Sequence, residues 1–222
     1  MNVVEKEKAL LGRKNRNSEG YYIEREDLQI MKCVGIIGAM EQEVARLKEV
    51  MENVSITTRA GMDFYEGILE GKKVVVVQSG IGKVNAGMCT QILVDLFQVE
   101  AVINTGIAGS LNNDINIGDI VLSTDVLHHD MDATGFGYPK GQIPQMKEFS
   151  FQADECLRKI AHNVCEEVNP EIQVFEGRIA SGDQFVCDQG VKDAIVKEFG
   201  AYAVEMEGAA IGQAAALNGV PF

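Results

Sequence analysis

The 222-residue chain has no tryptophan, only four prolines and only three histidines. It lacks H-E-x-x-H or any comparable arrangement of ligands, so we predict neither a metal ion nor a cofactor. Its five cysteines are an odd number, and no pair has C-x-x-C spacing. Isolated thiols within apolar segments are typical of reduced core residues, which indicates a cytoplasmic protein.

Long apolar runs are also missing. No stretch approaches the roughly 20 apolar residues that span a bilayer, and the charged N-terminus has no apolar signal-peptide core. The formal net charge is −13, and a field of this sign repels nucleic acid and anionic membranes. These features argue against nucleic-acid and membrane partners and favour the cytoplasm as the location.

The composition is that of a globular α/β protein, with 46% hydrophobic residues and 23 glycines. Short β-branched runs alternate with segments of helical period along the chain. This order predicts three layers, in which helices flank a mixed central β-sheet and right-handed crossovers join parallel strands. We expect strands at 33–38, 61–69, 73–78, 101–105, 119–126, 174–181 and 202–204, and helices at 40–51, 83–97, 151–168, 189–199 and 206–218.

The two ends of the chain differ from its middle. Residues 1–30 are charged and have no sustained period, which predicts a disordered N-terminal extension; a translated leader upstream of Met31 is the alternative. Residues 31–222 are expected to form one domain. Residues 219–222 resemble the opening of a strand, so we expect this domain to lack its C-terminal strand and helix, leaving a strand edge open.

Two glycine-rich turns depart from the common nucleotide-binding loops. The turn at 38–41 lacks the second glycine of G-x-G-x-x-G and places Glu41 where a pyrophosphate needs amides. The turn at 80–83 lacks the four-residue spacer of a P-loop. Each turn alone is most simply structural, because tight strand-to-helix turns need glycine. The pattern argues against a dinucleotide-binding dehydrogenase and a P-loop enzyme.

Several expected strand ends carry glycine or acidic residues, and in open α/β sheets the ligand binds outside the carboxyl ends of the strands. Six motifs occur in order: G-I-I-G-A-M-E-Q-E at 35–43, S-G-I-G-K-V-N-A at 79–86, N-T-G-I-A-G at 104–109, F-G-Y at 136–138, S-G-D-Q-F at 181–185 and V-E-M-E at 204–207. Together they resemble the 5′-methylthioadenosine/S-adenosylhomocysteine nucleosidases of the purine nucleoside phosphorylase superfamily, from Met31 to Phe222.

The resemblance implies a nucleoside phosphorylase-like fold and a thio-nucleoside substrate. The implied reaction is hydrolysis of the N-ribosidic bond of methylthioadenosine, adenosylhomocysteine and also 5′-deoxyadenosine. Adenine and the thioribose are the products for the two thio-nucleosides. Such a reaction belongs to methionine salvage and to removal of a methyl-cycle by-product.

The resemblance also assigns roles to residues. Glu43 matches the residue that activates the attacking water, Glu207 the carboxylate that holds the ribose hydroxyls, and Phe185 the ring that stacks on adenine. Taken alone, Glu43 is explained as an acid in a helix first turn, and Met40 and Met206 as core filler. The full set of implied substrate contacts is Met40, Ile81, Ile107, Ala108, Gly109, Phe185, Val186, Glu205, Met206 and Glu207.

The chemistry of the bond agrees with these roles. Breaking an N-ribosidic bond builds positive charge on the sugar, which carboxylates in a water-poor pocket stabilise. Glu43 can act as the general base for water, and its charge would repel phosphate. Hydrolysis is therefore favoured over phosphorolysis, and a purine nucleoside phosphorylase is the alternative within the enzyme class.

Two implications concern groups outside one pocket. The family's general acid is an aspartate in an R-x-x-S-D segment shortly after the position of Phe222, so we expect it to be absent, and Asp183 matches another position. A catalytically inactive nucleoside-binding fragment is therefore a second alternative. A loop that completes the neighbouring subunit's thioalkyl pocket implies a homodimer, and it is matched by Ala133, Phe136 and Pro144.

Overall fold

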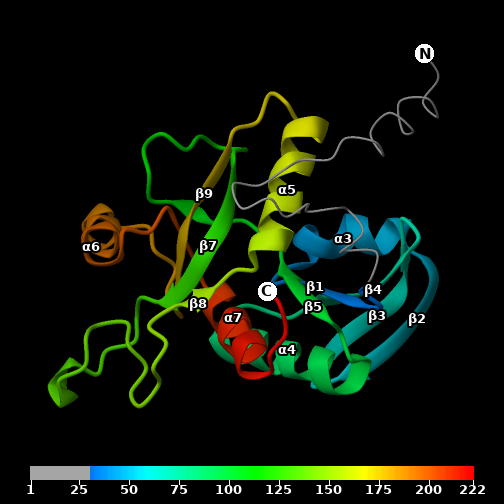
Figure 1. Cartoon of the computed structure of the whole chain (residues 1–222), viewed down its shortest axis with the longest axis horizontal. Coiled ribbons are helices and arrows are strands. Elements are labelled where there is room, and N and C mark those ends of the chain that lie inside the picture. Colours follow the sequence, from blue (N-terminus) through cyan, green and yellow to red (C-terminus); the bar gives the residue numbers. More distant parts are fainter. Residues whose placement is uncertain (1–30) are drawn as a thin grey trace, which may run out of the picture. The chain divides into compact units, whose positions relative to one another are not determined.

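The β-branched runs form the inner strands of two five-stranded sheets in the computed structural model, which describes residues 31–222 (Figure 1). The predicted extension at 1–30 lies outside the described residues and stays a prediction. In the first sheet β1 lies between β4 and β5 and runs parallel to both, and β2 and β3 add an antiparallel edge. The order is β2 (Glu52–Arg59), β3 (Met62–Leu69), β4 (Lys72–Gln78), β1 (Val34–Gly38) and β5 (Ala101–Asn104).

The second sheet is also mixed. Its strands β7 and β10 run parallel to β9, whereas β6 and β8 pair antiparallel at its two edges. The order is β6 (Gly109–Ser110), β10 (Ala203–Glu205), β9 (Val174–Ser181), β7 (Ile120–His128) and β8 (Phe151–Gln152). The predicted α/β class with mixed sheet and flanking helices is confirmed, and the strands are divided between two sheets.

Helices cover both faces of the first sheet. Successive residues of β1 point to opposite faces, so Gly35 and Gly38 report on the two sides. A Cβ added at Gly35 would lie 3.0 Å from Leu93, and one added at Gly38 would lie 2.8 Å from Val44. Leu93 belongs to α4 and Val44 to α3, and both side chains are fully buried. The helices are α3 (Glu41–Val50), α4 (Lys83–Phe97), α5 (Glu155–Val168), α6 (Gln189–Phe199) and α7 (Gly208–Leu217).

The apolar core joins β1, β3, β4 and β5 to α4 and α7. Phe64 and Ile37 are fully buried there, and each such side chain contributes about 1.5–3 kcal/mol by leaving water. A smaller cluster holds α6 against the second sheet. Within residues 31–222, no helix combines the length and apolar character needed to cross a membrane.

Some predicted boundaries are wrong for local reasons. The helix expected from 151 begins at Glu155, because Phe151 and Gln152 pair with β7 and the Asp154 carboxylate caps the helix by accepting the Leu157 N–H at 2.9 Å. Strands β2, β6 and β8 were not predicted. Strand β9 and helices α4 and α6 have the predicted bounds.

The last residues of the chain lie between the two sheets. Residues 219–222 are not a strand, yet the carbonyl of Pro221 accepts the N–H of Val102 in β5 at 2.9 Å. The carbonyl of Phe222 accepts the N–H of Asp154, just after β8, at 2.6 Å. This segment therefore contacts the edge strand of each sheet.

Candidate active site

The carboxyl ends of three parallel strands meet at one edge of the first sheet. The Ser79 N–H, after β4, donates to the carbonyl of Gly38 at 2.9 Å, and the Thr105 N–H, after β5, donates to the carbonyl of Ile37 at 2.9 Å. In the second sheet β9 and β10 end in parallel at Ser181 and Glu205. Ligands of α/β proteins bind at such edges, so the two sets of strand ends together mark the candidate site.

Glu43 lies at the third position of α3, directly after β1. Its Oε2 accepts the N–H of Met40 at 2.8 Å, as acids at this helix position often do. Its Oε1 accepts the N–H of Ile107 at 3.0 Å, from the segment after β5. Each oxygen accepts one backbone N–H, and a carboxylate oxygen has two lone pairs. Glu43 therefore retains capacity to accept a proton from a water molecule.

The approach of Glu43 to this segment depends on Gly106. A Cβ added at Gly106 would lie 2.6 Å from Oε1 of Glu43, closer than such contacts allow. Glycine is therefore the residue that lets the carboxylate bridge the ends of β1 and β5.

Glu207 joins the second sheet to the first. It lies between β10 and α7, is 8% exposed, and accepts the N–H of Gly82 at 2.7 Å through Oε1. Gly82 has φ +97°, a conformation that favours glycine. Burial raises the pKa of the Glu207 carboxyl, the Gly82 N–H opposes that rise, and the charges of Glu43 and Asp183 add to it. Glu43 and Glu207 thus act on each other within one site.

A charged cluster attaches the segment between β9 and α6 to the turn at 80–83, which also binds Glu207. Asp183 Oδ1 accepts the N–H of Lys83 at 2.8 Å, and the N–H of Asp183 donates to Asp130 at 2.9 Å. The Lys83 ammonium in turn pairs with Asp130 at 2.7 Å. Phe185 follows in this segment and is 83% exposed, while Val186 is buried. The sequence analysis gave Lys83 and Asp130 no role. The signal available in the sequence was an acidic residue, Asp130, two positions after the end of β7.

Glu205 has a different environment from Glu207. One carboxyl oxygen is hydrogen-bonded to the hydroxyl of Ser181, and the other accepts the N–H groups of Glu207 at 2.8 Å and Gly208 at 2.6 Å. Enclosure of the carboxyl group by protein raises its pKa. Glu205 therefore binds the protein's own donors at the end of β10.

Several of the predicted apolar residues belong to the backbone segments that bind these carboxylates. Met40 and Ile107 supply the N–H groups that hold Glu43, and Ile81 precedes the donor Gly82. Ile81 is 53% exposed and Ile107 is 77% exposed, so both offer apolar surface to a ligand. Ala108 and Gly109 lead into β6, which pairs with β10 beside Glu205 and Met206.

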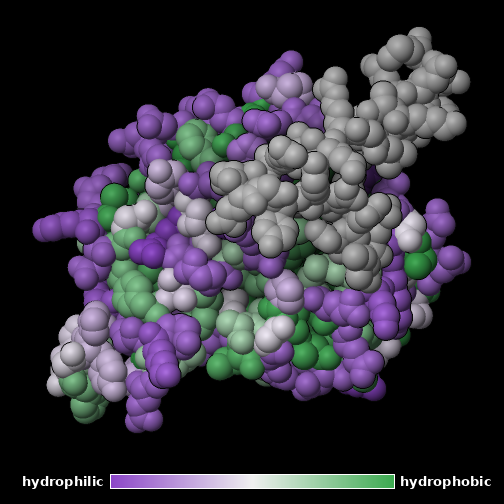
Figure 2. Space-filling view, viewed as in Figure 1, coloured by the Kyte–Doolittle hydropathy of each residue, from purple (hydrophilic) through white to green (hydrophobic). Residues whose placement is uncertain are grey.

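Ala133, Phe136 and Pro144 lie elsewhere, in the connection between β7 and β8. This connection projects away from the sheets and helices in Figure 1, and apolar colour marks its tip in Figure 2. Ala133 is buried, whereas Phe136 is 87% exposed. The three residues are thus not gathered around Glu43 by the fold of this chain.

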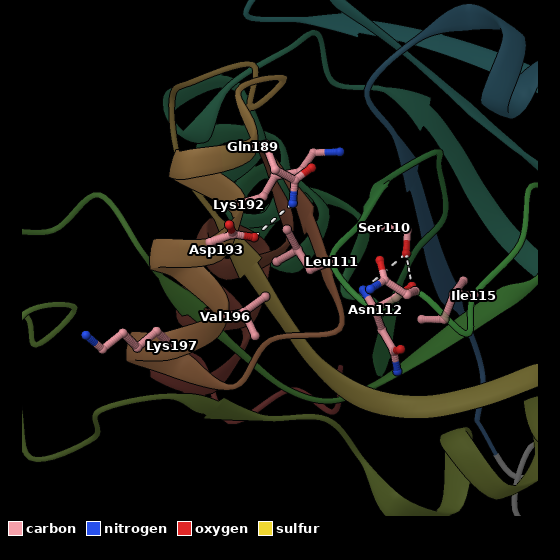
Figure 3. Close-up of a pocket in the computed structure, with 10 residues that line it drawn as sticks. Ser110, Leu111, Asn112, Ile115, Gln189, Lys192, Asp193, Val196 and Lys197 are labelled. Carbon is pink, nitrogen blue, oxygen red and sulfur yellow. Dashed lines mark hydrogen bonds between the residues drawn. The ribbon is translucent and has the colours of Figure 1, made fainter.

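A cavity of about 520 Å³ lies between α6 and the segment that runs from the end of β6 to Ile115 (Figure 3). Its walls include Ser110, Asn112 and Lys192, and none of Glu43, Phe185 or Glu207. The hydroxyl of Ser110 is already hydrogen-bonded to Asn112. Gln189 likewise donates to Asp193 at 2.8 Å, so these polar groups have local partners and the strand ends remain the better candidate for chemistry.

The side chains at the candidate site indicate the kind of ligand that it can hold. In the described part of the chain, His, Cys, Asp and Glu side chains form no group of three suited to a metal ion. Backbone N–H groups hold Glu43 and Glu207 instead. Carboxylates arranged in this way can accept hydrogen bonds from hydroxyl groups and can stabilise positive charge.

Comparisons with known proteins show the family to which the chain belongs. A family model described as the phosphorylase superfamily matches residues 34–222. The chain is similar to a 5′-methylthioadenosine/S-adenosylhomocysteine nucleosidase of Bacillus cereus (strain G9842), with 46% identity over 190 residues, 85% of this chain and 81% of that protein. A similar nucleosidase of Anoxybacillus flavithermus (strain DSM 21510 / WK1) is 48% identical over the same shares.

Solved structures give the same result. The nucleosidase of Colwellia psychrerythraea 34H in complex with adenine has a TM-score of 0.82 and 44% identity, and the match covers 86% of this chain and 79% of that one. The nucleosidase of Neisseria meningitidis in complex with methylthio-immucillin-A has a TM-score of 0.83 and 43% identity, with 86% and 82% covered. The similarity therefore extends over the strand ends that form the candidate site.

Proposed function

Because the chain belongs to the phosphorylase superfamily and, within it, to the 5′-methylthioadenosine/S-adenosylhomocysteine nucleosidases, we propose that it hydrolyses the N-ribosidic bond of these two nucleosides. The products are adenine and the corresponding thioribose. The observation that carries the proposal is the placement of Glu43 and Glu207 in one site where the ends of the two sheets meet.

Glu43 is the general base in this proposal. Its two oxygens are fixed by the Met40 and Ile107 N–H groups, so the carboxylate is aligned before substrate arrives. It takes a proton from water as the water oxygen bonds to C1′ and the bond from C1′ to N9 breaks. A positioned general base contributes about 10²–10⁴-fold in rate. A carboxylate at this place also repels phosphate, which supports water as the nucleophile.

Glu207 holds the ribose. Gly82 donates to its Oε1 and the Met206 N–H also interacts with the carboxyl group, and in this proposal the remaining lone pairs accept the 2′ and 3′ hydroxyls. Positive charge develops on the sugar as the base leaves, and a nearby carboxylate stabilises it more strongly in the transition state than in the bound substrate. The residue thus serves both binding and catalysis.

Adenine lies on the remaining side of the site. Phe185 offers an exposed ring for stacking, and Val186 follows with backbone groups for the edge of the base. The electron pair of the C1′–N9 bond passes to adenine, which takes a proton from solvent water in this proposal.

The chain works as a homodimer in the cytoplasm in this proposal. The projecting connection that carries Phe136 supports the first point, because its exposed ring can complete the apolar part of a neighbour's pocket. All five cysteines are free thiols, which supports a reducing compartment.

The test is release of adenine from methylthioadenosine and from adenosylhomocysteine, compared between the wild-type chain and Glu43→Gln. We expect the variant to lose about 10²–10⁴-fold in kcat while it still binds adenine in calorimetry. Glu41→Gln is the matched control, because Glu41 occupies the same helix turn but pairs with Lys48 at 2.7 Å.

Three outcomes would contradict parts of the proposal. A Glu43→Gln variant with full activity would reject Glu43 as the base. A wild-type chain that binds methylthioadenosine without releasing adenine would favour an inactive nucleoside-binding protein. Adenine release that requires inorganic phosphate would favour a phosphorylase.

A further inference from the structure

Three consecutive backbone N–H groups at the start of α7 are bound by two side chains from strand ends. The N–H groups of Glu207 and Gly208 donate to Glu205 at 2.8 and 2.6 Å, and the N–H of Ala209 donates to the Ser181 hydroxyl at 2.7 Å. The first N–H groups of a helix have no partner within the helix. Here Glu205 and Ser181 supply those partners, and they are also hydrogen-bonded to each other.

We propose that Glu205 is a positioning residue, which fixes the Glu207 carboxylate through the backbone at the start of α7 and does not contact substrate. This inference rests on the proposed function of Glu207 as the ribose-binding group. It replaces the expectation that Glu205 touches the nucleoside.

The hydrogen bonds of Glu205 support this role. The oxygen that receives the N–H groups of Glu207 and Gly208 has used both lone pairs, and the other oxygen is bound to the Ser181 hydroxyl. Little acceptor capacity therefore remains for a ribose hydroxyl. The Glu207 carboxyl group instead reaches the first sheet, where its Oε1 accepts the N–H of Gly82, and the N–H of Met206 also interacts with it.

The packing around Glu205 leaves little room for adjustment. A Cβ at Gly208 would lie 3.2 Å from Oε1 of Glu205, so this turn of the backbone passes close to the carboxyl group. Ser181 is fully buried. The negative side chain at the helix N-terminus is also favoured by the helix dipole. A change at Glu205 therefore moves the backbone from which the Glu207 side chain extends.

A double-mutant cycle tests the proposal. Glu205→Gln is measured alone, Glu207→Ala alone, and both together, with kcat/KM for methylthioadenosine and the dissociation constant for adenine as readouts. We expect Glu205→Gln to lower kcat/KM by about tenfold or more and to leave adenine binding unchanged, because adenine has no ribose for Glu207 to hold.

The cycle separates positioning from direct contact. If Glu205 acts through Glu207, Glu205→Gln causes little further loss in the Glu207→Ala background. Losses that multiply in the double variant overturn the proposal, since they indicate that Glu205 acts on substrate by itself. A Glu205→Gln variant with wild-type kcat/KM overturns it as well.

Ser181→Ala provides a second variant that does not change Glu205. It removes the hydroxyl that links Glu205 to Ala209, so we expect a smaller fall in kcat/KM with unchanged adenine binding. An unchanged kcat/KM in this variant counts against the proposal. The proposed function itself fails if the wild-type chain shows no methylthioadenosine hydrolysis, which is a different result.

Discussion

Gly106→Ala tests whether the position of the Glu43 carboxylate sets the rate. The added methyl group would lie 2.6 Å from Oε1 of Glu43, about 0.9 Å short of the ~3.5 Å at which carbon and oxygen atoms pack well. The carboxylate is the end of a flexible side chain, so it can move away. That movement takes Oε1 from the N–H of Ile107, now at 3.0 Å.

The expected cost follows from this displacement. A misplacement of about 1 Å in a catalytic group can reduce the rate about 10²-fold, or roughly 2.7 kcal/mol in the activation barrier. Folding should change little, because Gly106 does not have a positive φ and the side chain of Glu43 can relax. We therefore expect kcat for adenine release to fall about 10²-fold while the unfolding midpoint stays close to that of the wild type.

Gly87→Ala is the matched control. Gly87 lies inside α4, and a Cβ there would meet no atom within 4 Å. Replacing glycine by alanine within a helix stabilises it by about 0.5–1 kcal/mol, so this variant should unfold at higher temperature with unchanged kcat.

The double variant Gly106→Ala/Glu43→Gln shows whether the methyl group acts through Glu43. If it does, the double variant is no slower than Glu43→Gln alone. A folded Gly106→Ala variant with wild-type kcat would refute the argument, as would losses that multiply in the double variant.

Two other predictions concern pH and assembly. Burial raises the pKa of Glu207, and its carboxylate form is the one that holds ribose, so kcat/KM should fall on acidification at a pH above the ordinary glutamate value of 4.5. In Glu207→Gln this fall should shift or vanish in a pH–rate profile. An unchanged acid limb in the variant would reject the assignment of Glu207. Sedimentation should show a dimer. Phe136→Ala should lower kcat/KM for methylthioadenosine roughly tenfold without changing adenine binding. A fully active monomer would exclude a pocket shared between subunits.

The buried parallel strands could be predicted from the sequence because their runs of β-branched residues are distinctive. Strand β2 could not, since nearly all of its side chains are exposed and show no apolar alternation. It forms because Ala60 and Gly61 both adopt positive φ, at 50° and 76°, in a tight hairpin turn. Such turns are signalled most clearly by Asn-Gly or Asp-Gly, and Ala-Gly gives a weaker signal.

The site was predicted in part, and the limit is visible at Glu205 and Glu207. Residues two apart on a continuous strand point to the same side, so strand alternation alone predicts that both carboxylates face the substrate. The strand ends at Glu205, and Glu207 has φ −129° and ψ −40° at the start of α7. The bend at this point sends the Glu205 carboxylate to the N–H groups at the start of α7 and the Glu207 carboxylate to the N–H of Gly82, which follows β4. Only tertiary structure distinguishes them.

The crowding of acidic groups explains why this arrangement suits hydrolysis. Glu43, Glu207 and Asp183 each lie against a backbone N–H, yet the charges of the other two still raise the pKa of Glu207. Like charges this close make the site unfavourable for a phosphate anion and favourable for a cationic sugar. The repulsion that costs stability in the empty site is relieved as positive charge develops on the ribose, so the same electrostatics selects water as the nucleophile and lowers the barrier to bond cleavage.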